Sequence, residues 1–159
     1  MFQSIKSLVV LTILCLFANI GFAKSSTYKC MIQMKGYQGE EAYVVVSLVS
    51  KDGKYQKTLS VLGADKKWYP DLPEWHKAHS AKPTNISTIT GASIAGGDRR
   101  IVNLEIDDEL LNKGYMIRFE SAVEDQGYHV KDLEVPFTKE GLENKSEGKG
   151  FIRSVRFTN

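Results

Sequence analysis

The segment from Ile86 to Gly97 combines the residue types of this chain that are best suited to chemistry. It has little charge, three glycines, and hydroxyl groups at Ser87, Thr88, Thr90 and Ser93. Glycine and alanine beside a hydroxyl leave room for a large group to approach it, because they carry little or no side chain. The segment therefore offers a candidate acceptor hydroxyl. The alternative is a glycine-rich connection between strands, with no chemistry of its own.

Two enzymatic motifs match this segment only in part. A nucleophile elbow needs Gly-x-Ser-x-Gly, but Ala95 stands where the last glycine of the motif should be. A phosphate-cradling loop needs Lys and then Ser or Thr after its second glycine, whereas Gly97 and Asp98 follow Gly96. Hydrolysis would also need an acid and a base near Ser93, and nothing in the sequence places a histidine there. We therefore predict a non-catalytic module with no catalytic residues.

Two histidines, His76 and His79, raise the question of a metal site. They follow Asp71, a candidate helix cap with Glu74 three residues later, and Pro73 suits the first turn. On that helix Leu72, Trp75, His76 and His79 would form one stripe. Two imidazoles without a cysteine fall short of the three or four protein ligands that zinc usually takes. The pattern favours a packed aromatic and histidine face with no metal.

The first 23 residues have the features of a signal peptide. Lys6 supplies the positive charge, residues 8–20 are almost wholly apolar, and Gly21-Phe22-Ala23 is a small-x-small cleavage site. We expect an exported protein, periplasmic or secreted, that does not span the membrane after cleavage. With 21 basic and 19 acidic residues the chain is close to neutral, which argues against nucleic acid as a partner. Cys30 would be the one remaining cysteine, on the apolar face of a strand.

Residues 24–159 are predicted to form a single all-β domain, an antiparallel immunoglobulin-like sandwich of about seven strands. Alternating or β-branched runs predict strands at residues 28–34, 43–49, 55–62, 101–106, 114–123, 129–137 and 151–157. Asp52-Gly53 predicts a hairpin turn between the second and third strands. Pro136 cannot donate to a β-ladder, so its strand should lie at a sheet edge.

A long insertion, residues 63–98, separates the third and fourth predicted strands. Connections of this length without regular structure are usually functional or disordered. Disorder is unfavourable here, because Trp68, Tyr69 and Trp75 would be left in water. The insertion should hold one short helix and the hydroxyl-bearing segment.

Thr90-Gly-Ala-Ser93 resembles the flavin-acceptor motif of exported FMN-carrying proteins, in which a separate transferase esterifies FMN phosphate to a hydroxyl. The family pattern is Asp, two residues, Ser or Thr, Gly, Ala, and then the acceptor. Thr90, Gly91 and Ala92 match it and Ser93 occupies the acceptor position, whereas Ser87 replaces the leading acidic residue. The resemblance implies FMN near Ser93. Trp68, Tyr69 and Trp75 would then shield or stack on its ring, and Arg99 or Arg100 would neutralise its phosphate.

A broader resemblance covers nearly all of residues 24–159. It is carried by Tyr43-Val-Val-Val-Ser-Leu, Trp68-Tyr-Pro-Asp-Leu, residues 90–100 and Arg118-Phe-Glu-Ser-Ala-Val-Glu-Asp. These segments are similar to a family of predicted periplasmic proteins of unknown function, whose relatives occur near membrane-bound flavin or haem redox systems. The resemblance implies a redox-accessory or electron-transfer module that meets a flavin transferase or a membrane-bound redox protein. The alternative is an immunoglobulin-like binding module of the cell envelope without a cofactor, which would use exposed Trp68, Tyr69 and Trp75.

Overall fold

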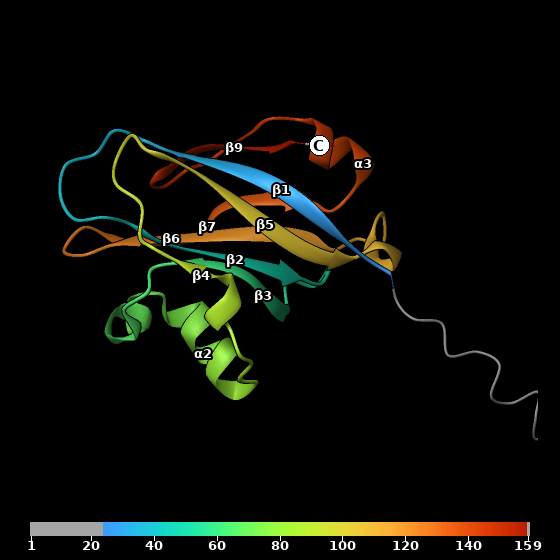
Figure 1. Ribbon diagram of the computed structural model, residues 1–159, viewed down its shortest axis with the longest axis horizontal. Helices are drawn as coiled ribbons and strands as arrows, with labels where there is room; N and C mark the ends of the chain where they lie inside the picture. Colours follow the sequence, from blue (N-terminus) through green and yellow to red (C-terminus); the bar gives the residue numbers. More distant parts are fainter. Residues whose placement is uncertain (1–23, 159) are drawn as a thin grey trace, which may run out of the picture.

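The computed structural model describes residues 24–158, and the predicted signal peptide lies outside them. The described chain forms two β-sheets that pack face to face, and a helical segment covers the outer face of one of them (Figure 1). The predicted all-β sandwich is confirmed. All seven predicted strands are present within a few residues of their expected bounds.

The first sheet has the strand order β5-β1-β9-β8, and its neighbouring strands are antiparallel. Its inward-facing side chains alternate along each strand; on β1 they are Cys30, Ile32 and Met34. The strands are β1 (Ser25–Met34), β5 (Arg99–Asp107), β8 (Ser146–Glu147) and β9 (Ile152–Thr158).

The second sheet has the order β4-β3-β2-β6-β7. Strand β7 lies at one edge, as Pro136 predicts. At the other edge the two-residue strand β4 pairs with β3 in parallel, a departure from the antiparallel prediction. The strands are β2 (Tyr43–Val49), β3 (Tyr55–Leu62), β4 (Thr90–Gly91), β6 (Met116–Val123) and β7 (Gly127–Pro136).

The strand order departs from that of immunoglobulin domains, although the two-sheet architecture is shared. In an immunoglobulin domain the first strand pairs with the second. Here β1 pairs with β5 and β9, whereas β2 pairs with β3 and β6. The first and last long strands therefore lie side by side, so both ends of the described chain belong to the first sheet.

The main core lies between the sheets and consists mostly of valine, isoleucine, leucine and phenylalanine. Cys30 is fully buried within it. Burial raises the pKa of the Cys30 thiol to about 12, which keeps it protonated and unreactive. The prediction of a structural cysteine on the apolar face of a strand is confirmed.

A second apolar cluster fixes the insertion onto the outer face of the second sheet. The strands present small side chains there, Val45, Val61 and Ala122, and the insertion packs Tyr69, Leu72, Trp75 and Ile86 against them. The insertion contains two 3-10 helices and one α-helix: η1 (Lys66–Asp71), α2 (Pro73–Ala81) and η2 (Ser87–Ile89).

The predicted helix is present as α2, but the prediction that Asp71 caps it is wrong. Asp71 ends η1, and Leu72, which has no side-chain acceptor, occupies the cap position of α2. Glu120 on β6 lies near this helix end; burial raises the pKa of its carboxyl to about 7, and the backbone N–H of Trp75 acts in the opposite direction. A carboxyl group from a distant strand thus lies at the N-terminus of α2, and burial favours its protonated form.

Two further short helices lie outside the insertion. They are η3 (Asp108–Leu110) and α3 (Lys139–Glu143). Thr138 caps α3 by accepting from the backbone N–H of Gly141 at 3.0 Å. Within residues 24–158, none of the helices has the length and apolar character needed to cross a bilayer.

Candidate functional site

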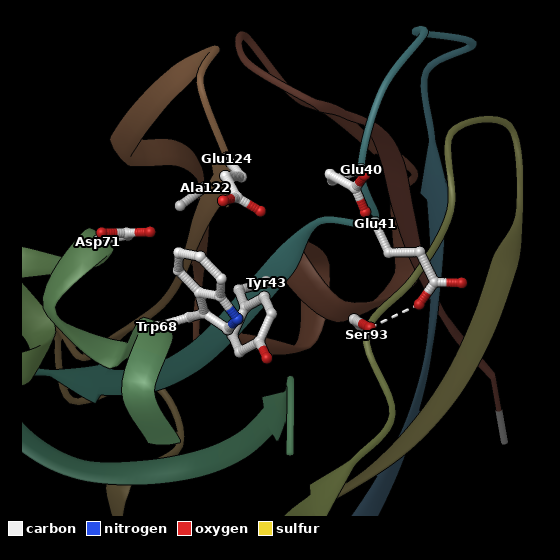
Figure 2. Close-up of a pocket in the computed structure, with 8 residues that line it drawn as sticks. All are labelled: Glu40, Glu41, Tyr43, Trp68, Asp71, Ser93, Ala122 and Glu124. Carbon is white, nitrogen blue, oxygen red and sulfur yellow. Dashed lines mark hydrogen bonds between the residues drawn. The ribbon is translucent and has the colours of Figure 1, made fainter. Parts of the chain in front are cut away.

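A pocket of about 210 Å³ lies at one end of the second sheet, between the sheet and the insertion (Figure 2). Its floor is formed by Tyr43 on β2 and Ala122 on β6, which are paired across the two strands. Trp68 on η1 and Ser93, which follows β4, line it from two sides. Four carboxylates complete the lining: Glu40, Glu41, Asp71 and Glu124.

Ser93 presents its hydroxyl to a carboxylate. Its Oγ lies 2.5 Å from Oε2 of Glu41, a hydrogen bond between side chains 52 positions apart (Figure 2). Ser93 lies in the irregular connection after β4 and is half-buried, whereas Gly91 and Ala92 just before it are exposed. The hydroxyl therefore has both an adjacent proton acceptor and open backbone beside it.

The glycines that follow Ser93 have structural reasons to be glycine. A Cβ at Gly96 would lie 2.5 Å from the carbonyl oxygen of Tyr37, and Gly97 has a φ of +84°. Ile94 bridges to Ala42 through two backbone hydrogen bonds, of 2.8 and 3.1 Å. The backbone on the C-terminal side of Ser93 is thus fixed, in agreement with the alternative of a glycine-rich connection for that part of the segment.

The two arginines predicted to neutralise a phosphate point in different directions. Arg100 reaches the acceptor segment, where its Nη2 donates to the carbonyl oxygen of Ser93 at 3.4 Å. Arg99 donates to Oε1 of Gln33 on the outer face of the first sheet. Successive side chains of a strand face opposite ways, so the structure brings Arg100 to Ser93 and places Arg99 elsewhere.

The three aromatic residues of the insertion also divide into two groups. Trp68 is half-buried and lines the pocket. Tyr69 and Trp75 are 5% and 1% exposed, and they belong to the second apolar cluster. The indole N–H of Trp75 donates to Thr58 at 2.9 Å, and His79 stacks on the ring with centroids 5.3 Å apart. The predicted aromatic and histidine face is therefore confirmed as packing, and no exposed cluster of all three aromatics exists.

Negative charge continues beyond the pocket. A second hollow shares Trp68, Asp71 and Glu124 with the first and extends past Asp125 to Tyr128. The ring of Trp68 is approached by one cation of the chain, the exposed Lys67, whose Nζ lies 5.0 Å from the indole centroid. The arrangement is an acidic groove with an indole at its centre. No cluster of three or more potential metal ligands occurs within residues 24–158.

Sequence reasoning missed the carboxylates of this groove. Glu40 and Glu41 come just before Ala42 and β2, and Glu124 comes directly after β6. The two strands are antiparallel neighbours, so the start of one meets the end of the other. The sequence does show an acidic pair beside each of these two strands. Only the pairing of the strands, however, reveals that the two acidic pairs lie close together.

Fold and pocket together define the class: an all-β sandwich with an acidic, hydroxyl-bearing pocket on the outer face of one sheet. Residues 25–154 match the model of the family described as predicted periplasmic protein (DUF2271), a domain of unknown function. The chain belongs to this family, as its sequence resemblance indicated, and a periplasmic location follows from that membership. Neither the curated proteins nor the solved structures contain a match to the chain.

Proposed function

We propose that this protein is a non-catalytic redox-accessory module that carries FMN esterified to Ser93. The observation that carries the proposal is the hydrogen bond of 2.5 Å between the Ser93 hydroxyl and the Glu41 carboxylate, at the rim of a pocket that contains Trp68. A hydroxyl needs a base to become a nucleophile at neutral pH, and Glu41 is within reach of its proton. Ser87 stands where the acceptor pattern has an acidic residue, and Glu41, from a distant part of the chain, places a carboxylate beside Ser93 instead.

Three features of the site favour the group, whereas the four carboxylates of the pocket oppose its phosphate. Ser93 is accessible along exposed Gly91 and Ala92. Trp68 offers an aromatic face in the pocket. Lys67, which lies over this ring, is an exposed side chain that a ligand can displace. Arg100 stands at the Ser93 backbone with a positive charge for a phosphodiester. Tyr69 and Trp75 support this surface from within the second apolar cluster.

Attachment requires an activated donor, because FMN itself has no good leaving group on phosphorus. With a flavin dinucleotide held by a transferase, Ser93 Oγ would form the new P–O bond while the pyrophosphate bond breaks and the mononucleotide leaves. Glu41 would accept the hydroxyl proton. The flavin would supply one- or two-electron transfer once bound, and a membrane-bound redox protein is the partner that such a role requires.

Intact-mass spectrometry of protein recovered from the exported fraction, with a flavin transferase present, tests the proposal. We expect a mass increase of one FMN minus one water, visible flavin absorbance, and loss of both in Ser93→Ala. Ser87→Ala and Thr88→Ala are matched controls, since both hydroxyls are exposed on the same segment. An unmodified wild-type protein, or an adduct that persists in Ser93→Ala, would refute the proposal.

A second candidate is a cofactor-free binding module of the cell envelope. Five carboxylates line the two joined hollows, and the indole of Trp68 already attracts a cation, Lys67. This combination favours a ligand with a positive group, such as an organic amine or a lysine-rich segment of another protein. Colourless protein of unmodified mass that binds such a ligand, and loses the binding in Trp68→Ala, would favour this candidate.

A further inference from the structure

The outer face of the first sheet carries a third hollow, which has the opposite charge. It has a volume of about 340 Å³ and is lined by four cationic residues, Arg99, Lys145, Arg153 and Arg156, together with Met31, Gln33 and Ser154. No carboxylate is among its lining residues. Lys145 has a weak contact with Glu147 at 3.7 Å, whereas Arg153 and Arg156 form no ion pair with any residue in the described part of the chain.

Apolar side chains lie among these cations. The register aligns Ile101 with Met31, and Met31 with Arg156, so the three form one row across β5, β1 and β9. Ile101 is 63% exposed, the one large hydrophobic residue left so open within residues 24–158. The insertion covers the other sheet and leaves this face free (Figure 1).

The segregation of charge gives this face its significance. The chain has 21 basic and 19 acidic residues, so net charge alone produces little attraction to any surface. Yet the Ser93 pocket is lined by four carboxylates and no cation, and the hollow beside Met31 is lined by four cations and no carboxylate. This separation of opposite charges gives the molecule an electric dipole. A charged surface can therefore orient the molecule, with the cationic side toward negative charge.

We propose that the outer face of the β5-β1-β9-β8 sheet docks on an anionic phospholipid surface. Guanidinium groups bind headgroup phosphates with paired hydrogen bonds, and clustered basic residues hold a protein at such a surface. Ile101 and Met31 would enter the boundary between headgroups and acyl chains, while the longer arginine side chains keep their charge at the phosphates. An exposed isoleucine next to the cationic hollow favours lipid over an acidic protein surface. This inference does not depend on flavin at Ser93.

Co-sedimentation of the mature exported protein with vesicles tests the proposal. We expect binding to vesicles of phosphatidylcholine with phosphatidylglycerol, weak binding to phosphatidylcholine alone, and a decline as salt rises. Arg153→Ala with Arg156→Ala should weaken binding by about 30-fold, since each basic residue near such a surface contributes about 1 kcal/mol. Ile101→Ser should also weaken binding, and this loss should be insensitive to salt.

A matched control removes two positive charges elsewhere. Lys51 and Lys54 are exposed at the hairpin between β2 and β3, in the other sheet, so Lys51→Ala with Lys54→Ala should bind vesicles almost as wild type. Unchanged denaturant midpoints would show that all variants fold. Absence of wild-type binding, equal losses in both double variants, or full binding by Ile101→Ser would overturn the proposal. Saturable binding of inorganic phosphate without vesicle binding would also overturn it, as a soluble-anion site.

Discussion

Ser93 and Glu41 are joined by a hydrogen bond of 2.5 Å, although 52 positions separate them in sequence. The contact exists because the residues that follow Ser93 and Glu41, Ile94 and Ala42, form a β-bridge just before β2. The hydroxyl is therefore held at the carboxylate by the backbone pairing of the residues that follow Ser93 and Glu41. This arrangement keeps the acceptor at a fixed place on the pocket rim without burying it.

Replacing Glu41 by Gln should slow flavin attachment at Ser93. The amide preserves the size of the side chain but cannot take the hydroxyl proton, and general-base catalysis typically contributes about 10²- to 10⁴-fold. The rate is measured by the growth of the adduct mass with time in the presence of transferase and flavin dinucleotide. Glu40→Gln is the matched control, because Glu40 lines the same pocket without bonding to Ser93. Equal rates for the two variants would remove Glu41 from the reaction.

The two tryptophans should differ sharply in their effect on stability. Trp75 is 1% exposed and bonds to Thr58, so Trp75→Ala should lower the free energy of unfolding by about 3 to 5 kcal/mol. Trp68 is half-buried, and Trp68→Ala should cost about 1 kcal/mol or less while emptying one side of the pocket. Urea unfolding measures both. Similar losses would mean that Trp68 also belongs to the core.

Sequence periodicity located the sheets well because alternation directly reports burial on one face of a strand. It could not give the partners of Arg99 and Arg100, because these depend on the pairing of β5 with β1 and on the path of the segment before β5. Nor could it separate Trp68 from Trp75, since both are equally apolar and only the packing of α2 on Val45 and Ala122 buries one of them. The acidic pocket required the pairing of β2 with β6, a contact between distant segments.

Asp132 should be a strong determinant of stability. It is fully buried and accepts three hydrogen bonds: from Ser121 Oγ at 2.5 Å, Gly150 N at 2.6 Å and Ile152 N at 2.8 Å. Asp132→Ala would leave these donors unsatisfied, and we expect a loss of about 3 kcal/mol or more. Ser121→Ala removes only one of the three bonds and should cost about 1 kcal/mol. Chemical denaturation of both variants tests this ranking, which would be contradicted if Ser121→Ala were the more damaging.

Glu120 should make stability depend on pH. It is 3% exposed, and burial raises the pKa of its carboxyl to about 7, although the Tyr128 hydroxyl, Arg118 and the backbone of Trp75 favour the charged form. The nearby Glu74 acts in the same direction as burial. A raised folded-state pKa means that the folded protein holds this proton more tightly than the unfolded chain. The contribution of Glu120 to the free energy of unfolding is thus fully present below about pH 4.5 and is lost as pH rises through about 7. The total loss is at most about 3 kcal/mol.

Glu120→Gln should remove this dependence. The amide oxygen can still accept from the Tyr128 hydroxyl, which lies 2.5 Å from the Glu120 carboxylate, and no charge develops under α2 as pH rises. Urea unfolding at steps from pH 4.5 to 8 should show a declining free energy for wild type and a flatter profile for the variant. The variant should be the more stable protein above pH 7. Glu105→Gln, which alters an exposed carboxyl on β5, should retain the wild-type slope. Glutamine does not ionise, so the variant cannot contribute to the pH dependence at this position. If its free energy of unfolding declined with pH as steeply as that of wild type, Glu120 would not be the group responsible.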